Sequence, residues 1–325
     1  MSAKAVLLFS GGLDSILACR IIADQGIEVT GLTFETPFFG AARAKATAMQ
    51  LGISHTIINI TEEHLHMLHA PRYGYGKNMN PCIDCKILML KIAGRVMEEI
   101  GADFLFTGEV VGQRPMSQGK QTLLMIAKNA GLADRLLRPL SARLLPETEP
   151  ERTGKVDRSR LWDIQGRGRK RQIEMAGVFG ITSWPAPAGG CLLTDPIFSR
   201  RLRDLFAHDP AYRIRDIELL KTGRHLRLRD KIKAIVGRNS SENDRIESLA
   251  KQEDALIRAK DFPGPTVLLP GGGDEETRAL AGRLCLRYSD APRNEETSVT
   301  CLQNGISSSF LSIALTLEAS EAMLI

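Results

Sequence analysis

Residues 10–15, "SGGLDS", combine two glycines, a carboxylate and two hydroxyls directly after the apolar run "AVLLF". Glycines let a backbone turn tightly and bring its N–H groups close to an anion, and the N-terminus of a following helix adds unpaired N–H donors. The pattern predicts a phosphate-binding loop that runs into a helix. The residues that we expect to contact a nucleotide in this loop are Ser10, Gly11, Gly12, Asp14 and Ser15.

Asp14 is poorly suited to direct contact with a phosphate, since both groups are anionic. We expect it to cap the helix or to bind the Mg²⁺ that accompanies a nucleotide, and we count it among the catalytic residues. The alternative is an ordinary glycine-rich turn whose Asp or Ser caps the helix. The stretch matches neither GxxxxGK[ST] nor GxGxxG, which argues against γ-phosphate transfer and against a dinucleotide.

Three of the six cysteines lie in settings that suit chemistry. Cys82 and Cys85 form a CxxC at the start of an expected helix, where a lowered pKa favours the thiolate. Cys191 follows two glycines in "PAPAGGC", a loop whose backbone can approach a site closely. Because the thiolate is the form that attacks, carries sulfur or binds metal, we take Cys82, Cys85 and Cys191 as candidate catalytic and metal-binding residues.

The other cysteines and the histidines leave alternatives open. Cys19 lies among apolar residues and is assigned to the core, while Cys285 and Cys301 lack a ligand pattern and are expected to be inert. A lone CxxC is also typical of a redox pair or of half a zinc site, with "HLHMLH" (residues 64–69) as the nearest source of histidines. An iron–sulfur cluster held by three thiolates is a further alternative. It would leave one iron open to bind hydrosulfide, although four cysteines are usual.

Strands and helices alternate along the first part of the chain and would position these residues. We expect strands at residues 5–9, 27–34, 54–60 and 103–108, and helices at 15–25, 41–51, 87–100 and 172–178. Such alternation indicates an α/β fold with a doubly wound parallel sheet and right-handed crossovers. We assign residues 1–196 to this domain.

Charge and composition change after residue 196. The formal net charge of +5 allows a polyanionic partner without proving one. Residues 200–238 hold twelve Lys or Arg against five Asp or Glu, and in "HLRLRDKIKAIVG" a period of two predicts a strand with one basic face. We assign residues 197–293 to a smaller basic α+β domain. Residues 294–325 have no Lys or Arg and are expected to be a poorly ordered tail or an amphipathic helix without an assigned role.

The first apolar run is too short for a signal peptide, and no run approaches the ~18 apolar residues of a membrane span. We therefore expect a cytoplasmic protein without a membrane partner, whose cysteines are thiols, ligands or catalysts rather than a disulfide framework.

The stretch "SGGLDS" after "AVLLF" resembles the PP-loop of the ATP pyrophosphatases, whose fold is that of the adenine nucleotide alpha hydrolases. The resemblance implies that the loop binds the pyrophosphate part of ATP, which is cleaved between the α and β phosphates while a substrate is adenylated. It also implies adenine binding near the end of the second strand, around Leu32 to Phe34.

"NPCIDCK", "FLFTGEVVGQRPMSQ" and "PAGGCLLTDP" together resemble the PP-loop tRNA thiolation enzymes of the 4-thiouridine and 2-thiouridine types. In cluster-dependent members a CxxC and a distant cysteine hold a [4Fe–4S] cluster, which implies that role for Cys82, Cys85 and Cys191. In other members two cysteines form a persulfide and resolving pair, with Cys191 matched to Cys82 or Cys85. The resemblance also makes Gly108 and Gln113 nucleotide contacts.

The resemblance covers residues 1–196, and the ferredoxin-like, THUMP and rhodanese domains of related enzymes do not appear. Residues 200–290 resemble the small RNA-binding domain of the NFACT type.

We therefore expect a tRNA sulfurtransferase that adenylates a uridine carbonyl and replaces its oxygen by sulfur, taken from sulfide or a persulfide carrier. Whether the protein forms a homodimer stays open. The alternatives are a PP-loop ligase that adenylates a small molecule and holds structural zinc, and an RNA-binding protein that senses nucleotide.

Overall fold

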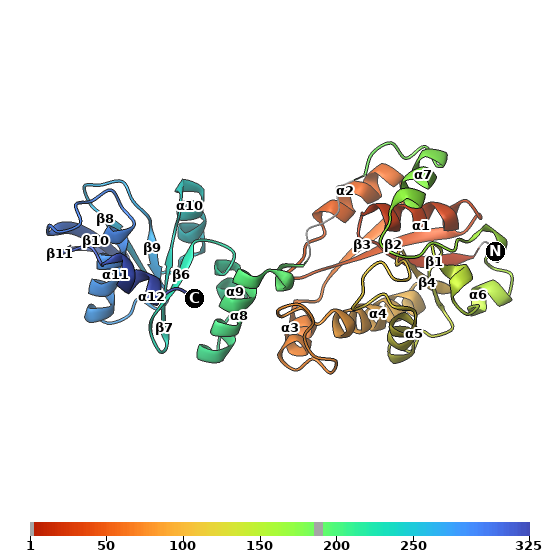
Figure 1. Ribbon diagram of the computed structural model, residues 1–325, viewed down its shortest axis with the longest axis horizontal. Coiled ribbons are helices and arrows are strands. Elements are labelled where there is room, and N and C mark those ends of the chain that lie inside the picture. The colour runs from red at the N-terminus through yellow and green to blue at the C-terminus, as the bar shows by residue number, and fades with distance from the viewer. Residues whose placement is uncertain (1–2, 185–190) are drawn as a thin grey trace. The chain divides into compact units, whose positions relative to one another are not determined.

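The computed structural model describes residues 3–184 and 191–325, and the chain divides into two compact units, Met1–Thr194 and Asp195–Ile325 (Figure 1). The boundary falls two residues before the one expected from the sequence. None of the described helices combines the length and the apolar character needed to cross a membrane.

The first unit is built on a five-stranded sheet in which every neighbouring pair is parallel, in the order β3-β2-β1-β4-β5. The strands are β1 (Lys4–Leu8), β2 (Glu28–Glu35), β3 (Ser54–Asn59), β4 (Phe104–Thr107) and β5 (Leu136–Leu137). The order reverses at β1, so the crevice outside the carboxyl ends of β1 and β4 is where such sheets bind ligands. The predicted α/β class and parallel sheet are confirmed.

Helices pack on both faces of this sheet (Figure 1). Their bounds are α1 (Leu13–Ala23), α2 (Ala42–Leu51), α3 (Thr61–His69), α4 (Cys82–Glu99), α5 (Lys120–Asn129), α6 (Glu149–Arg152) and α7 (Lys170–Val178). Leu7 and Phe106 pack with α1, α2 and α7, whereas Val6 and Leu105 pack with α4 and α5. Successive side chains of the central strands point to opposite faces of the sheet, and both faces are buried. The sequences of these strands are therefore continuously apolar.

The second unit contains a six-stranded antiparallel sheet in the order β11-β10-β8-β9-β7-β6. Its strands are β6 (Arg224–Arg229), β7 (Ile232–Val236), β8 (Ala255–Ala259), β9 (Val267–Leu269), β10 (Thr297–Gln303) and β11 (Ile306–Ser312). Its helices are α8 (Pro196–His208), α9 (Ile214–Leu219), α10 (Ser240–Leu249), α11 (Glu275–Arg287) and α12 (Leu317–Ala322). Residues of α11 pack on one face of the sheet, and residues of α9 and α10 pack on the other.

Two expectations for this unit are wrong. "HLRLRDKIKAIVG" is not a single strand but the hairpin β6–β7, which turns at Asp230 and Lys231. Residues 294–325 are not a separate tail, because β10 and β11 belong to the sheet and α12 follows them. Asn304 and Gly305 both have positive φ between these strands, which is the backbone that a two-residue hairpin turn requires.

Candidate active site

The predicted phosphate loop connects β1 to α1 with its amide groups available. Ser10 Oγ lies 3.3 Å from Ser15 Oγ and accepts from Gly12 N at 3.4 Å, so the two hydroxyls border the same turn. Gly12 is the residue before α1, and no side chain caps this helix within the described residues. The first N–H groups of α1 are therefore free to bind an anion, and the helix dipole favours negative charge there.

Glycine is required at two positions around this loop. Gly11 has φ +68°, and a Cβ atom there would lie 2.8 Å from Ala44 Cα. At Gly108, just after β4, a Cβ atom would lie 2.6 Å from both Asp14 C and Ser15 N. Backbone atoms of β4 and α1 thus meet with no space for a side chain.

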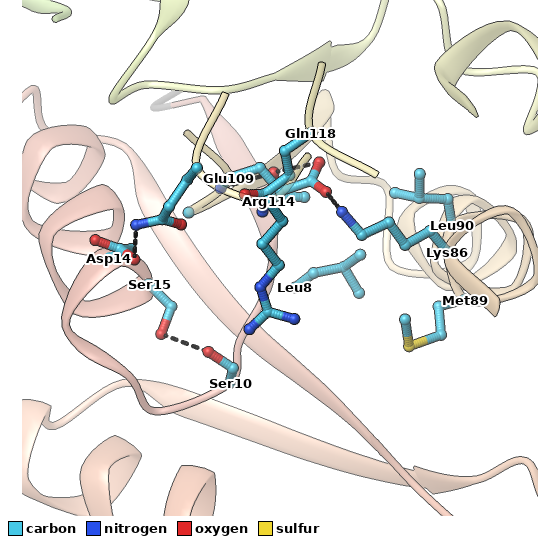
Figure 2. A pocket seen from close by; sticks show the side chains of 13 residues that line it. Leu8, Ser10, Asp14, Ser15, Lys86, Met89, Leu90, Glu109, Arg114 and Gln118 are labelled. Carbon is cyan, nitrogen blue, oxygen red and sulfur yellow. Dashed lines mark hydrogen bonds and ion pairs between the residues drawn. The ribbon is translucent and has the colours of Figure 1, made fainter. Parts of the chain in front are cut away.

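A cavity of about 210 Å³ opens at the carboxyl ends of β1 and β4, where the sheet order predicts a ligand (Figure 2). It is lined on one side by Ser10, Asp14 and Ser15 and on the other by Gly108 and Gln113. The structure therefore brings together five residues that the sequence proposed as nucleotide contacts. The Gln113 amide donates to Asp14 Oδ2 at 3.0 Å, and this contact joins the two sides.

Asp14 does not cap α1 with its side chain. Its second oxygen, Oδ1, is buried and has no hydrogen-bond partner within the described part of the chain. An unpartnered carboxylate oxygen fits the hard oxygen ligands that Mg²⁺ prefers.

A buried ion network closes the far wall of the cavity, and the sequence reasoning missed it. Lys86 pairs with Glu109 and contacts the carbonyl of Ser117 at 3.3 Å. The Arg138 guanidinium donates to Glu109 Oε2 at 3.0 Å. Burial alone raises the pKa of Glu109, but Lys86 and Arg138 outweigh it and lower the pKa to about 2. One carboxylate faces two cations, so the network keeps a formal charge of +1 beside the cavity.

Two further lining residues were also missed. The Arg114 side chain extends toward the cavity from the loop after β4, and it forms no ion pair within the described residues (Figure 2). Gln118 is buried, and its Oε1 has no hydrogen-bond partner in the described part of the chain. "GQRPMSQ" marks this loop in the sequence, but only the fold shows which side chains reach the cavity.

The segments that carry the three candidate thiols are tied together. Met79 N donates to the Leu193 carbonyl at 3.1 Å, and Asn78 Nδ2 donates to the Thr194 carbonyl at 2.7 Å. The Cys191 thiol lies 3.9 Å from the Phe38 carbonyl. The loop before the CxxC and the start of the segment after residue 190 therefore form one structure, while the glycines before Cys191 lie outside the described residues.

The thiols are more buried than the sequence suggested, and this overturns the expected depression of the pKa at Cys85. Burial raises the pKa of Cys85 above its usual range, and the neighbouring Cys191 and Cys82 raise it further. Burial, together with Cys82, raises the pKa of Cys191 to about 11. Desolvation thus outweighs the helix N-terminus. All six cysteines are free thiols. Cys19 is buried, as its assignment to the core predicted, and Cys285 and Cys301 are buried as well.

The described side chains do not form a metal site, and Phe34 does not reach the cavity. Within residues 3–184 and 191–325, no set of three or more His, Cys, Asp or Glu side chains is arranged to hold a metal ion. On α3, His64 is buried while His66 and His69 are exposed, so this helix is only half exposed. The Phe34 side chain packs in the core and does not line the cavity, so only the backbone at the end of β2 remains for the expected adenine contact.

Two known families are similar to separate parts of the chain. Residues 1–143 match the family described as "Thiamine biosynthesis protein (ThiI)". Residues 223–321 match the family described as "NFACT protein RNA binding domain". The second match includes β10, β11 and most of α12, in agreement with their place in the sheet of the second unit.

Curated relatives match about a third of the chain. A "Probable tRNA sulfurtransferase" of Alkaliphilus metalliredigens is 35% identical over 117 residues, which cover 34% of this chain and 29% of that protein. A "tRNA-specific 2-thiouridylase MnmA" of Rhodopseudomonas palustris is 27% identical over 142 residues, which cover 38% and 36%. The chain thus spans about a third of the length of these relatives.

Among solved structures, a "predicted subunit of tRNA methyltransferase" of Methanocaldococcus jannaschii is 17% identical with a TM-score of 0.36. It covers 54% of this chain and 74% of that one.

Proposed function

We infer from its ThiI-family domain (residues 1–143) and its NFACT RNA-binding-type domain (residues 223–321) that this protein is an ATP-dependent tRNA uridine sulfurtransferase. It adenylates a uridine carbonyl, releases pyrophosphate and replaces the carbonyl oxygen by sulfur. Relatives whose names state tRNA thiolation support this reading of the first domain.

The proposal rests on helix α4, which carries both two of the candidate thiols and part of the cavity wall. Cys82 and Cys85 lie in its first turn, while Lys86, Met89 and Leu90 line the cavity next to the phosphate loop. Residues three and four apart share a face of a helix, so Cys82, Lys86 and Met89 follow one another along one side of α4. A single rigid element therefore connects the thiols with the nucleotide cavity.

In the first step, the free amides of α1 and the hydroxyls of Ser10 and Ser15 hold the pyrophosphate part of ATP. Asp14, through its unpartnered oxygen, would hold Mg²⁺, whose charge neutralises the phosphate oxygens. The uridine oxygen attacks the α-phosphate, the bond to the β-phosphate breaks, and pyrophosphate leaves. The net positive charge of the Lys86–Glu109–Arg138 network lies where negative charge accumulates.

In the second step, a cysteine of the Cys82, Cys85 and Cys191 set carries a persulfide whose outer sulfur attacks the adenylated carbon. The C–O bond breaks and AMP leaves with the oxygen. A second thiol of the set attacks the inner sulfur, so the thiouridine departs and a disulfide remains for reduction by an external thiol. The described residues do not form a metal-binding set, and we derive no step through a [4Fe–4S] cluster.

The second unit would hold the tRNA, consistent with its match to an RNA-binding family. We place the reaction in the cytoplasm, because six free thiols suit a reducing compartment. A persulfide carrier would load the cysteine: the thiolate attacks the outer sulfur of the carrier's persulfide, the carrier's S–S bond breaks, and the carrier keeps its thiol.

Mass spectrometry of tRNA nucleosides tests the proposal. A strain lacking this gene should lose one thiolated uridine, and the wild-type gene should restore it. Cys191→Ser should fail to restore it while the purified variant still binds ATP; Cys301→Ala, which alters a buried thiol of the second unit, should restore it. An unchanged nucleoside profile in the deletion strain would refute the function. ATP cleavage without tRNA would then point to adenylation of a small molecule.

A further inference from the structure

The loop before the CxxC, "RYGYGK", displays aromatic and cationic side chains together. All six residues from Arg72 to Lys77 are exposed, and Tyr73 and Tyr75 retain 37% and 43% of their surface. They are two of the four tyrosines of the whole chain. Large aromatic side chains are normally buried at least in part for their apolar area, so two exposed rings in one loop indicate a surface that contacts something else.

The backbone of this loop is anchored by the CxxC and by α3. Asp84, which lies between the two cysteines, accepts from Arg72 N at 3.1 Å and from Tyr73 N at 2.9 Å. The Tyr75 hydroxyl donates to the Leu68 carbonyl at 2.5 Å. The polar end of this tyrosine is therefore fixed to the backbone of α3. A loop fixed in this way loses little conformational entropy when it binds a partner.

The loop also borders the entrance to the cavity. A Cβ atom at Gly76 would lie 3.8 Å from the terminal methyl of Met116, which is 63% exposed. Met116 belongs to the same short loop as Arg114, and that arginine lines the cavity. The aromatic loop and the cavity thus share one rim.

The charges on this rim favour a polyanion. Arg72, Lys77 and Arg114 are cations without ion-pair partners in the described part of the chain, and residues 70–78 contain no Asp or Glu. The Arg72 guanidinium lies 5.5 Å from the centre of the Tyr73 ring. Unstacked bases bind to aromatic faces and guanidinium planes, while nearby cations bind the phosphates.

We propose that the Arg72–Lys77 loop, with Arg114 and Met116, is a stacking platform that holds the single-stranded nucleotides next to the target uridine. This inference rests on the proposed function, because it assumes an RNA substrate. The target base must leave its stack to enter the cavity, which exposes the faces of its neighbours. Tyr73 covers one of those faces and holds the strand at the entrance. Stacking tolerates every base, so the platform orients the RNA without reading its sequence.

Fluorescence anisotropy with the full-length protein and a labelled ten-nucleotide single-stranded RNA tests the platform. Tyr73→Ala should weaken binding about tenfold, in line with the measured value of one base–aromatic stack. Tyr73→Phe should bind like the wild type, whereas Tyr73→Leu, which is apolar but not aromatic, should behave like Tyr73→Ala. Val178→Ala removes an exposed side chain of α7 as a matched control and should have no effect.

Kinetics with tRNA separate this proposal from the proposed function. Tyr73→Ala should raise KM for tRNA about tenfold and leave ATP affinity and the melting temperature unchanged. Equal RNA affinity and equal KM for wild type and Tyr73→Ala would overturn the platform even if the wild type thiolates tRNA. A wild type that binds RNA through Tyr73 but never thiolates it would instead overturn the chemistry and leave the platform standing. The platform would also be overturned if the wild type did not bind single-stranded RNA and the loop bound a protein instead.

Discussion

At the scale of single residues, Gly108 shows how closely the two sides of the nucleotide site approach. The resemblance of the surrounding stretch implied that Gly108 contacts a nucleotide. The reason that a glycine is needed there depends on the position of Asp14 and Ser15, which lie far away in the chain. The sequence could predict Ser10, Gly11, Asp14 and Ser15 because they are adjacent. It could not predict Lys86, Glu109 and Arg138, which become a network only when α4, β4 and β5 are assembled.

Gly108→Ala should damage nucleotide binding directly. The added Cβ would lie 2.6 Å from backbone atoms of Asp14 and Ser15, so the phosphate loop must shift. We expect ATP affinity, measured by titration calorimetry with a non-hydrolysable analogue, to fall at least tenfold, and unfolding free energy to fall by about 1–3 kcal/mol. Gly177→Ala, at a helical site with open space around it, is the matched control and should change neither. Unaltered ATP affinity in Gly108→Ala would place the phosphates elsewhere.

At the scale of elements, helix α3 is fixed to the first unit by an unusual contact. His64 is fully buried between Phe38 and Phe39, with ring centroids 5.4 Å and 5.5 Å away. Both of its ring nitrogens have no partner in the described part of the chain. Burial lowers the pKa of His64 to about 4, since a charged imidazole would be desolvated there.

The first unit should therefore lose stability in mild acid. The unfolded chain takes up a proton at His64 near pH 6.5, whereas the folded chain resists it down to about pH 4, so stability falls as pH falls through this window. Between pH 7 and pH 5 the loss should reach about 2 kcal/mol. Denaturant unfolding followed by tryptophan fluorescence measures it, because Trp162 and Trp184 both belong to the first unit. His64→Leu should flatten this pH dependence and His66→Leu should not; an equal slope in wild type and His64→Leu would disprove the assignment.

Strands were predicted well where glycines separate them from the neighbouring helices. They were predicted poorly where two strands are joined by a turn of only two residues. Glycines punctuate the β/α units of the first unit, so the four expected strands correspond to β1–β4. In the second unit, polar and apolar residues alternate on both sides of Asp230 and Lys231. This pattern concealed the turn between β6 and β7. Asn304–Gly305 was a usable hairpin signal, but the absence of Lys and Arg around it suggested a tail instead.

At the scale of the whole molecule, sequence charge overstates the positive surface of the second unit. Arg227 pairs with Asp204, and Arg229 pairs with Asp274 and Glu276. His225 is buried and contacts the carbonyls of Leu219 and Thr222 rather than solvent. Counting charges along a chain cannot show this, because several of the acidic partners lie outside the basic segment.

RNA binding should accordingly depend on salt less than the composition suggests. If all twelve Lys and Arg of residues 200–238 contacted phosphates, log K would fall with log salt with a slope of about −8 for a single strand. Five of the twelve form ion pairs, so the seven others should give a slope of about −5. Anisotropy of the full-length protein with labelled tRNA between 50 and 300 mM KCl (roughly the range over which such slopes are measured) gives the value. A slope near −8 would show that the ion pairs open on binding.

The central place of β1 also has a consequence for the order of events during synthesis. The phosphate loop leaves the ribosome before the rest of the first unit, and β1 can pair with β2 soon afterwards. Its other neighbour, β4, begins only at Phe104. At roughly 5–20 residues per second, seconds pass before Gly108 and Gln113 can close against Asp14. The nascent chain thus carries half of a nucleotide site for that interval, and ATP becomes a ligand only once the sheet has been completed on both sides of its first strand.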